Sequence, residues 1–517
     1  MGISIVKPAG VPGRSWPAIV IGCFVAFGGL LFGYDTGTIG GILAMDYWRK
    51  EFSTGYVNPN DKILDVSPSQ SAAVVSILSA GTFFGALTAA PLADLFGRRL
   101  ALLLSAGIVF NFGVVLQTAS TALPMFIAGR FFAGFGVGLI SALIPLYQSE
   151  TAPKWIRGVI VGCYQLAITI GLLLAAVVDN ATQHRNDTGS YRIPIAVQFL
   201  WAIILVIGLL FLPETPRYLI KLGKSSSYLD CFRGGMAKRL ATGCLLQALQ
   251  QLTGVNFIFY YGTQYFKNSG ISNAFVIQMI TSAVNVSSTL PGLYGIEKFG
   301  RRPLLLWGAV GMCISQLLVA VLGTVTTGQN PDGSVFAKNL AGQKASIAFI
   351  CIYIFFFAST WGPLAWVVCG EIFPLKVRAK ALSMSVATNW LLNWAIAYST
   401  PYLVNYGEGN ANLQSKIFFI WFACCFVCIA FVYFMIYETK GLTLEQIDEL
   451  YESNTSAKNS VHWKPSKHFV DLVDGHENGG VLVDEKTDEK TSASHSAHSP
   501  ARHAESGHDN AVASGRE

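Results

Sequence analysis

A single carboxylate stands inside the first long apolar run of the chain. The run begins at Ile19 and carries no charge before Asp35, which lies in "LFGYDTGTIGG". An ionisable group in a segment that is long enough to cross a bilayer marks a candidate functional site, and it needs a partner. The candidate partner is Arg130, in the apolar stretch "GRFFAGFGVG". A buried Asp changes its proton affinity when it separates from an Arg, whereas a permanent ion pair would only position two helices.

Small residues surround both charges. Glycines repeat at every fourth residue beside them, at Gly33, Gly37, Gly41, Gly134 and Gly138. Small faces of this kind let helices approach closely. We therefore expect the first and fourth membrane helices to touch and to bring Asp35 and Arg130 together.

Side-chain amides gather in later apolar stretches. They occur as Gln165, Gln250, Gln251, Asn256, Asn285, Asn389 and Asn393. Amides are costly in a bilayer unless they face a cavity or another helix. Such a cluster is suited to a ligand rich in hydroxyl groups, but amides also bond helices to one another without any ligand. The residues alone leave both interpretations open.

The composition indicates a membrane protein. Hydrophobic residues make up 52% of the 517 residues and charged residues only 13%, about half the load of a soluble domain. The net charge is +6, and no run of Lys and Arg is dense enough for a nucleic-acid surface. The ten cysteines show no CxxC pair or metal-ligand spacing, so neither a disulfide framework nor a metal site is predicted.

Stretches of about 20 apolar residues, the length that crosses the hydrocarbon, occur about twelve times. The first six lie near residues 17–44, 67–91, 100–119, 123–148, 156–179 and 191–213, and the second six near 237–265, 272–296, 303–326, 345–373, 379–404 and 415–437. With both termini inside, the cytoplasmic loops hold about twice as many Lys and Arg residues as the outer loops. The sequence therefore predicts an all-α, multi-pass membrane protein, whose first span is too long for a cleaved signal.

The predicted organisation is a cytoplasmic N-terminus, two six-helix halves, a linker and a tail. Their bounds are 1–16, 17–213 for the first half, 214–236 for the linker, 237–437 for the second half and 438–517 for the tail. The tail is polar from about residue 453, so disorder is expected there. Glycosylation sequons at Asn180 and Asn186 fall in a predicted outer loop, whereas a third, at Asn285, falls inside a helix.

The two halves repeat one another. "ADLFGRR" matches "IEKFGRR", "SETAPKWIRG" matches "GEIFPLKVRA", and "PETPRYL" matches "YETKGL". The acids and bases concerned are Asp94, Arg98, Arg99, Glu150, Arg157, Glu214 and Arg217, then Glu297, Arg301, Arg302, Glu371, Arg378 and Glu438. Parallel repeats of this kind surround a central pathway in secondary transporters. A carboxylate at a helix end can pair with Arg or cap a helix N-terminus, so we expect these groups to latch the halves together inside. The alternative is exposed salt bridges worth about 0–1 kcal/mol.

With these motifs placed, residues 17–452 resemble the sugar porter family of the major facilitator superfamily, and within it the fungal monosaccharide transporters. The motifs are "GYDTGTIGG", "GALTAAPLADLFGRR", "PLYQSETAPKWIRG", "PETPRYL", "QALQQLTGVNFIFYY", "WGPLAW" and "ETKGLTLEQIDEL". The resemblance implies the major facilitator fold, with twelve helices in two pseudo-symmetric halves around a central site. It also implies a monomeric transport unit without a cofactor.

The resemblance implies roles for individual residues. Those expected to line the sugar site are Gln165, Gln250, Gln251, Asn256, Asn285 and Asn393, while Trp366 and Trp390 would pack against the ring or gate it. Asn389 joins this set because it lies four residues before Asn393. Tyr260 and Tyr261 would close the site from outside, and Asp35 with Arg130 would carry a coupling proton.

Two departures from the family pattern stand out. Some members have Glu where this chain has Ala358, which puts one contact to the sugar in doubt. The family normally has several short helices between the positions of Lys224 and Tyr228, and that segment is absent here. We therefore expect a looser inner latch.

The predicted function is symport of a monosaccharide, glucose or another hexose, with a proton across the plasma membrane. The alternatives are a proton-independent hexose facilitator and a glucose sensor. An ATP-driven pump is disfavoured because the "GK" at 223–224 lacks the upstream glycine of a phosphate-binding loop. No set of nucleophile, base or metal ligands points to an enzyme.

Overall fold

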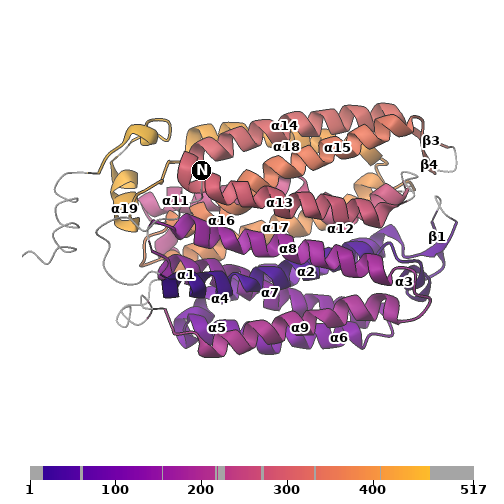
Figure 1. Cartoon of the computed structure of the whole chain (residues 1–517), viewed down its shortest axis with the longest axis horizontal. Coiled ribbons are helices and arrows are strands. Elements are labelled where there is room, and N and C mark those ends of the chain that lie inside the picture. Colours follow the sequence, from indigo (N-terminus) through magenta and orange to yellow (C-terminus); the bar gives the residue numbers. More distant parts are fainter. Residues whose placement is uncertain are drawn as a thin grey trace, which may run out of the picture. The chain divides into compact units, whose positions relative to one another are not determined.

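The computed structural model describes residues 16–58, 62–153, 155–215, 218, 227–268, 273–330, 334–407, 409–453 and 455–465. Residues 1–15, Arg217 and most of the predicted tail lie outside the described residues. The described part of residues 1–464 is a bundle of long helices that run side by side (Figure 1).

The first half contains α1 (Trp16–Val25), α2 (Phe27–Ile42), α4 (Pro68–Phe96), α5 (Arg98–Leu104), a π-helical turn (Ser105–Phe110), α6 (Asn111–Thr118), α7 (Leu123–Thr151), α8 (Arg157–Thr182) and α9 (Gly189–Phe211). Between α2 and α4 lie the short α3 (Asp46–Glu51) and a hairpin of β1 (Tyr56–Val57) and β2 (Leu64–Asp65).

The second half follows a 3₁₀ turn (Tyr228–Phe232) and contains α11 (Gly235–Leu252), α12 (Val255–Asn268), α13 (Ala274–Phe299), α14 (Arg301–Thr326), α15 (Leu340–Phe356), a π-helical turn (Phe357–Trp361), α16 (Gly362–Glu371), α17 (Arg378–Val404), a 3₁₀ turn (Gln414–Lys416) and α18 (Ile417–Met435). A second hairpin, β3 (Thr327–Gln329) with β4 (Val335–Ala337), joins α14 to α15. After α18 come α19 (Leu444–Glu452) and a 3₁₀ turn (Asn459–His462).

Four predicted crossings are interrupted rather than continuous. The first divides into α1 and α2, and π-helical turns interrupt the third and the tenth. The seventh, predicted as one helix over 237–265, breaks at Gly254, whose φ of 86° belongs to the left-handed region that favours glycine. Interruptions at membrane depth are tolerated where the freed backbone groups are bonded again inside the protein.

Within the described residues, nine helical stretches are both long and apolar enough to cross a bilayer. The predicted seventh, eighth and eleventh crossings (α11 with α12, α13 and α17) fall below that limit. These helices carry most of the predicted amides. Their polar residues lower the mean hydropathy below the limit for a membrane span. The same polar residues indicate a buried site.

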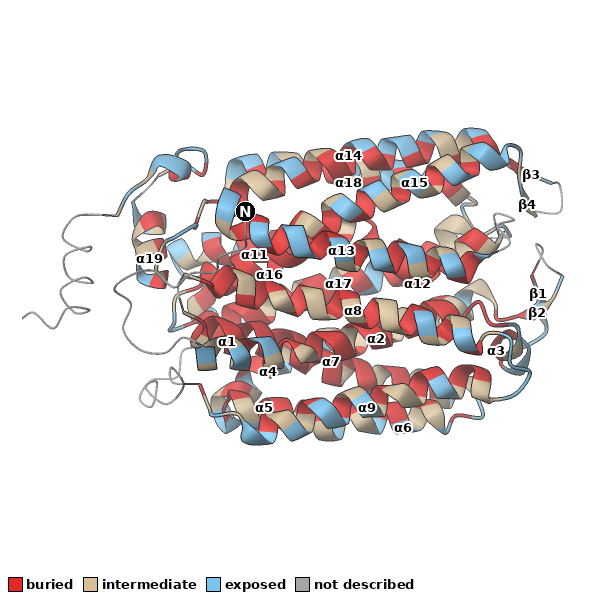
Figure 2. Cartoon of the chain, in the orientation of Figure 1, coloured by how far each residue is buried: buried red, intermediate tan, exposed pale blue. Residues whose placement is uncertain are grey.

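Large apolar side chains cover the outside of the bundle. Trp307, Phe211 and Phe434 are 71%, 84% and 73% exposed, and exposed residues lie along the outer helices α5, α9 and α14 (Figure 2). An apolar surface of this extent requires a lipid surrounding. The described residues therefore form a multi-pass membrane protein.

Glycines pack α2 against α8. A Cβ at Gly29, Gly33, Gly37 or Gly41 would meet Tyr164, Ile168, Ala175 or Asp179 of α8, respectively. Gly134 and Gly138 of α7 lie in the same way against backbone carbonyls of α4. The first and fourth spans do meet as expected, at the ion pair of Asp35 and Arg130. The glycines named for that contact turn elsewhere, however, because those of α2 face α8 and those of α7 face α4.

The chain stays ordered beyond the predicted limit near residue 453. Thr443 caps α19, and Tyr437, Leu450 and Ala457 form a small apolar cluster. Asp448 of α19 pairs with Arg239 of α11, and burial raises the pKa of Asp448 above its usual range despite that partner. The helix after the last span is thus attached to the second half.

Candidate functional site

The charged pair of Asp35 and Arg130 lies buried between α2 and α7. Arg130 Nη1 donates to Asp35 Oδ1 at 3.0 Å, and the two residues are 1% and 0% exposed. Asp35 Oδ2 and the Nε and Nη2 of Arg130 have no partner among the described residues. The pair is therefore incompletely bonded, and a proton on Asp35 would weaken a single hydrogen bond.

Tyr260 of α12 bonds to the second half's amides. It is 1% exposed, and its hydroxyl donates to Asn393 Oδ1 of α17 at 3.1 Å. This side chain, predicted as an outer gate, is therefore a partner of the amide cluster.

Asn389 of α17 joins two amides of α11. Its Nδ2 donates to Gln247 Oε1 at 2.7 Å and to Gln250 Oε1 at 2.9 Å. Gln250 Nε2 in turn donates to the carbonyls of Trp361 and Gly362, at 3.0 and 3.1 Å. Those carbonyls are where the π-helical turn meets α16, so the interruption of the tenth span supplies acceptors to the site.

Gln251 and Asn393 form the next link. Asn393 Nδ2 donates to Gln251 Oε1 at 3.2 Å, and the Asn256 amide donates to the same oxygen. Ser79 of α4 donates to Asn393 Oδ1 at 2.6 Å, which brings the first half into the network. Five of the seven predicted amides therefore lie in one cluster.

Both predicted tryptophans bridge the halves. Trp366 Nε1 donates to Gln165 Oε1 of α8 at 3.1 Å, and its ring meets that of Tyr164 edge-on. Trp390 Nε1 donates to Ser141 Oγ of α7 at 3.0 Å. Both rings are therefore buried at the interface between the halves.

Asn285 of α13 stands apart from the cluster. It is 1% exposed, and its Oδ1 has no partner among the described residues. A buried amide oxygen without a donor costs about 1–3 kcal/mol. The Oδ1 of Asn285 is therefore able to accept a hydrogen bond from a ligand.

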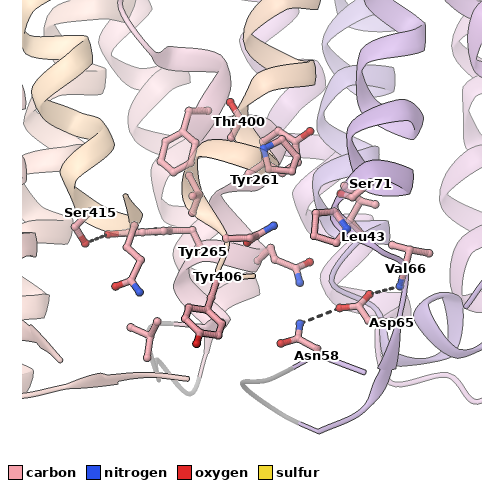
Figure 3. Close-up of a pocket in the computed structure, with 18 of the residues that line it drawn as sticks. Leu43, Asn58, Asp65, Val66, Ser71, Tyr261, Tyr265, Thr400, Tyr406 and Ser415 are labelled. Atoms are coloured by element: carbon pink, nitrogen blue, oxygen red, sulfur yellow. Dashed lines mark hydrogen bonds between the residues drawn. The ribbon is translucent and has the colours of Figure 1, made fainter. Parts of the chain in front are cut away.

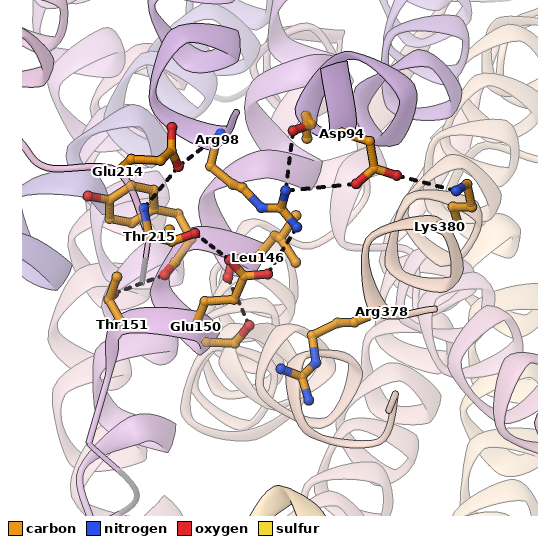
Figure 4. A network of polar contacts seen from close by, with 12 residues as sticks. Asp94, Arg98, Leu146, Glu150, Thr151, Glu214, Thr215, Arg378 and Lys380 are labelled. Carbon is orange, nitrogen blue, oxygen red and sulfur yellow. Dashed lines mark hydrogen bonds and ion pairs between the residues drawn. The ribbon is translucent and has the colours of Figure 1, made fainter. Parts of the chain in front are cut away.

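The end of the bundle that carries the repeated arginines, called here the arginine end, lies at the left of Figure 1. Arg98 Nη2 donates to Glu150 Oε1 at 3.2 Å, and Thr215 donates to Glu150 Oε2 at 2.7 Å (Figure 4). Glu214 accepts the backbone N–H groups of Arg98 and Arg99, both at 3.0 Å, and so caps the start of α5. Pairing and capping thus occur together.

The second half repeats this arrangement. Arg301 donates to both oxygens of Glu371, at 2.7 and 3.1 Å, and Thr439 donates to Glu371 Oε2 at 2.7 Å. Glu438 accepts the backbone N–H groups of Arg301 and Arg302 at 3.0 and 3.1 Å. The repeat seen in the sequence is a repeat of hydrogen bonds.

The first acid of each repeat pairs with the arginine four residues on: Asp94 Oδ1 lies 3.8 Å from Arg98 Nη1, and Glu297 Oε1 lies 3.4 Å from Arg301 Nη2. Asp94 has a further partner in the second half, because its Oδ2 lies 3.3 Å from Lys380 Nζ. Figure 4 shows Lys380 reaching Asp94. Tyr228, in the turn before the second half, attaches the linker to the first half, because its hydroxyl donates to the Leu87 carbonyl at 2.8 Å.

Two predicted arginines begin helices at this end. Arg157 is the first residue of α8, and Arg378, whose Nε donates to the Phe373 carbonyl at 3.0 Å, is the first of α17. Both are buried. The third, Arg217, lies outside the described residues.

The opposite end, called here the hairpin end, is closed by contacts of α12. Tyr261 donates to the Ala397 carbonyl at 2.8 Å, and Lys267 Nζ lies 2.7 Å from Asp46 Oδ1 of α3. Beside them lies a hollow that is lined by both hairpins and by tyrosines, among them Tyr261 and Tyr265 (Figure 3). Both ends thus hold bonds between the halves.

The shortened linker leaves no acid of the repeat without a partner. Each of the four carboxylates expected to lose contacts, Glu150, Glu214, Glu371 and Glu438, accepts hydrogen bonds from described residues.

Sequence reasoning missed several partners of these groups. They are Ser79, Ser141, Thr215, Lys380 and Thr439. Thr215 and Thr439 had a signal, since "ET" occurs in both "PETPRYL" and "YETKGL". The two serines had none, because small hydroxyl residues are common inside apolar helices.

Comparison with known proteins gives one consistent answer. The family described as "Sugar (and other) transporter" matches residues 21–228 and 223–451, two segments that meet at the shortened linker. The major facilitator-type transporter ecdD of Aspergillus rugulosus is 65% identical over 505 residues, covering 90% of this chain and 93% of that protein. The probable glucose transporter rco-3 of Neurospora crassa is 47% identical over 522 residues, covering 92% and 86%.

A solved structure shares the architecture. It is the proton:xylose symporter XylE from E. coli bound to 6-bromo-6-deoxy-D-glucose. It superposes with a TM-score of 0.71 at 26% identity, over 85% of this chain and 100% of that one. The described helices therefore form the twelve-helix major facilitator fold.

Proposed function

The chain belongs to the sugar transporter family of the major facilitator superfamily, and from that premise we propose that it carries a monosaccharide, glucose or another hexose, together with a proton across the plasma membrane. The arginine end faces the cytoplasm and the hairpin end faces outward. A relative named as a glucose transporter supports the sugar, and a neighbour named as a proton symporter supports the coupling.

In this proposal the second half holds the sugar. The linked amides of Gln250, Gln251, Asn389 and Asn393 supply donors and acceptors that match a ring of hydroxyl groups, and the buried Trp366 and Trp390 face it. Without a sugar, these amides form hydrogen bonds with one another. A sugar must replace those bonds with its own, so specificity arises from how well its hydroxyls do so.

The first half holds the proton. When Asp35 takes up a proton, it loses the charge that attracts Arg130, and α2 and α7 become free to shift. The observation that carries the proposal is the buried and incompletely bonded pair of Asp35 and Arg130. A proton on Asp35 removes its attraction to Arg130, and this supplies the difference between two states that coupling requires.

The two ends act as gates. At the arginine end, the pair of Asp94 with Lys380 holds the halves together, and at the hairpin end the pair of Asp46 with Lys267 does so. Alternating access requires that one set parts while the other stays closed.

The test is uptake of radiolabelled glucose by yeast that lacks its own hexose transporters, at acid and alkaline pH, with and without a protonophore. We expect concentrative uptake that is stimulated by acid and abolished by the protonophore. Asp35→Asn should remove accumulation while the protein still reaches the cell surface. Uptake that only equilibrates and ignores the proton gradient would identify a facilitator.

A further inference from the structure

The hollow at the hairpin end has no role in the account above. The first half contributes β1, β2 and the start of α4 to its lining, and the second half contributes α12 and the end of α17. Figure 3 shows Leu43 and Asp65 on one side of it and Tyr265 and Tyr406 on the other. A concave place between two structural units, with aromatic walls and a few polar groups, is a typical ligand site.

The hollow holds polar side chains that are not bonded to the rest of the protein. Among the described residues that line it, five form no hydrogen bond through their side chains: Tyr56, Ser71, Gln264, Asn405 and Tyr406. Tyr406 is 44% exposed, and the other four are half-buried. A side-chain amide offers donors and an acceptor, and so does each hydroxyl group. The hollow therefore presents hydrogen-bonding capacity of both kinds to a ligand.

The charge within the hollow is already paired. Asp65 is the one charged residue among the described residues of the lining, and its Oδ2 lies 2.8 Å from Arg49 Nη2. Asn58 donates to the same oxygen at 2.9 Å, and the Val66 backbone N–H donates to Oδ1 at 2.8 Å. Burial, together with the charge of Asp65, raises the pKa of Tyr56, so its hydroxyl stays neutral. These groups suit an uncharged polar ligand rather than an ion.

Tyrosine rings supply the apolar part of the lining. Tyr56 of the first half is joined there by Tyr261, Tyr265 and Tyr406 of the second half. Each tyrosine presents an apolar ring with a polar tip. A monosaccharide has hydroxyl groups around its rim and two slightly apolar faces, so it can use the rings and the free amides together. A lipid chain would leave the amides without partners.

The hollow is separate from the proposed sugar site. Thr400 of α17 lines it and stands seven residues beyond Asn393, or about 10 Å along the helix toward the hairpin end. Three residues before Leu43, which also lines the hollow, α2 touches α12, because a Cβ at Gly40 would lie 2.4 Å from the Phe259 carbonyl oxygen. The hollow therefore lies on the outer side of a closed contact between the halves.

The free polar groups come from both halves. Two of the five belong to the first half and three to the second. Opening of the outer gate, the pair of Asp46 with Lys267, moves the halves apart at this end and separates the two sets. A ligand that is bonded to both sets therefore binds the outer-closed state better than the outward-open state, and it shifts the equilibrium toward the closed one.

We propose that the hollow is a second, outer binding site for a monosaccharide. It fills from the external solution while the outer gate is closed, and the sugar bound there opposes the opening of that gate. High external sugar therefore slows the transporter that carries it. This inference rests on the proposed sugar specificity and on the proposed orientation.

The first test is binding of glucose to purified full-length protein, measured by saturation-transfer NMR, which detects weak binding. We expect two phases as the glucose concentration rises. The double variant Gln264→Leu with Asn405→Leu should weaken the lower-affinity phase about tenfold or more, because two side chains that bond hydroxyl groups are lost. Asn389→Ala should weaken the higher-affinity phase instead. The matched control is Gln183→Leu, which removes an amide just beyond the end of α8, at the same end of the bundle but outside the lining of the hollow.

The second test is the initial rate of glucose uptake by yeast against external glucose concentration. The wild-type rate should pass through a maximum and then fall by about twofold or more. The double variant should keep the wild-type KM within about twofold and should not show the fall, whereas Gln183→Leu should show it in full. A preserved KM demonstrates that the double variant is folded and that its inner site is intact.

The outcomes separate this site from the proposed function. Wild-type protein that neither binds nor transports glucose would overturn the sugar specificity and the outer site together. A single binding phase that Asn389→Ala removes would overturn the outer site alone. A weaker phase that the double variant and Gln183→Leu lose equally would also overturn the outer site, because the hollow would then have no special part in it. Two phases without any fall in the uptake rate would overturn the claim that the outer sugar opposes opening.

Discussion

The two halves of the molecule are near copies at the arginine end and differ in their interiors. At the arginine end, Glu150 and Glu371 each accept from an arginine and a threonine, and Glu214 and Glu438 each cap a helix. In the interior, the first half buries the ion pair of Asp35 and Arg130, whereas the second half buries the linked amides of α11 and α17.

The difference indicates a division of labour. Symmetric bonds suit the end where both halves must open and close in the same way. An ionisable carboxylate can bind a proton, and neutral amides can bind the hydroxyl groups of a sugar. The interiors of the two halves therefore differ because each half binds a different substrate. Each prediction below changes one side of this comparison.

The largest expected effect comes from breaking the ion pair on one side. Arg130→Met leaves Asp35 buried without its partner and should destabilise the protein by about 3–5 kcal/mol. The double variant Asp35→Asn with Arg130→Met should recover most of that loss, because no charge remains buried. Thermal unfolding in detergent measures both, and a double variant less stable than Arg130→Met would contradict the view that the interior of the first half is organised around charge.

Next in size is the loss of one amide from the second half. Asn389→Ala removes the donor shared by Gln247 and Gln250, which should weaken glucose binding by about 1–3 kcal/mol, or about 5- to 150-fold. The control is Gln117→Ala, which removes an equally buried amide from the first half. Initial uptake rates against glucose concentration give the comparison, and equal effects of the two changes would rule out a sugar site confined to the second half.

A smaller effect should distinguish the two copies at the arginine end. Glu371 is held by two bonds from Arg301, but Glu150 by one from Arg98, so Glu150 depends more on its threonine. Thr215→Val should therefore cost about 1 kcal/mol of stability and Thr439→Val less. The melting temperatures of the two single variants test this difference. A larger loss of stability with Thr439→Val would mean that Glu371 depends more on its threonine than Glu150 does.

The smallest effect concerns the ion pair of Lys380 with Asp94, which joins the halves at this end. Lys380 and Asp94 have side chains that are 11% and 23% exposed, so Lys380→Met should change stability by about 0–1 kcal/mol. Added salt should reduce the difference between variant and wild type, because partly exposed charges are screened. A difference of more than about 2 kcal/mol that ignores salt would show that the pair acts as a buried one.

Much of this arrangement was predictable from the sequence. Apolar length and the positive loops predict the spans, and the repeated motifs predict two similar halves. The partner of Asp35 follows because Arg130 is the basic residue in a comparably apolar stretch, and charge must be paired in a membrane interior. The amide cluster follows from the cost of burying amides singly.

The rest depends on three-dimensional packing. Glycine spacing shows that a helix has a small face but not which neighbour packs on it, and the face of Gly33, Gly37 and Gly41 on α2 packs on α8. Helix breaks such as the one at Gly254 depend on whether the freed backbone groups find partners inside the fold.

The central claim is that the proton acts in the first half and the sugar in the second. The most direct test reconstitutes wild type, Asp35→Asn and Asn389→Ala in proteoliposomes and measures, for each, glucose exchange without a gradient and glucose accumulation under an inward proton gradient. The account predicts that Asp35→Asn keeps exchange and loses accumulation, whereas Asn389→Ala is impaired in both. Asp35→Asn that still accumulates glucose, or Asn389→Ala that loses accumulation alone, would contradict it.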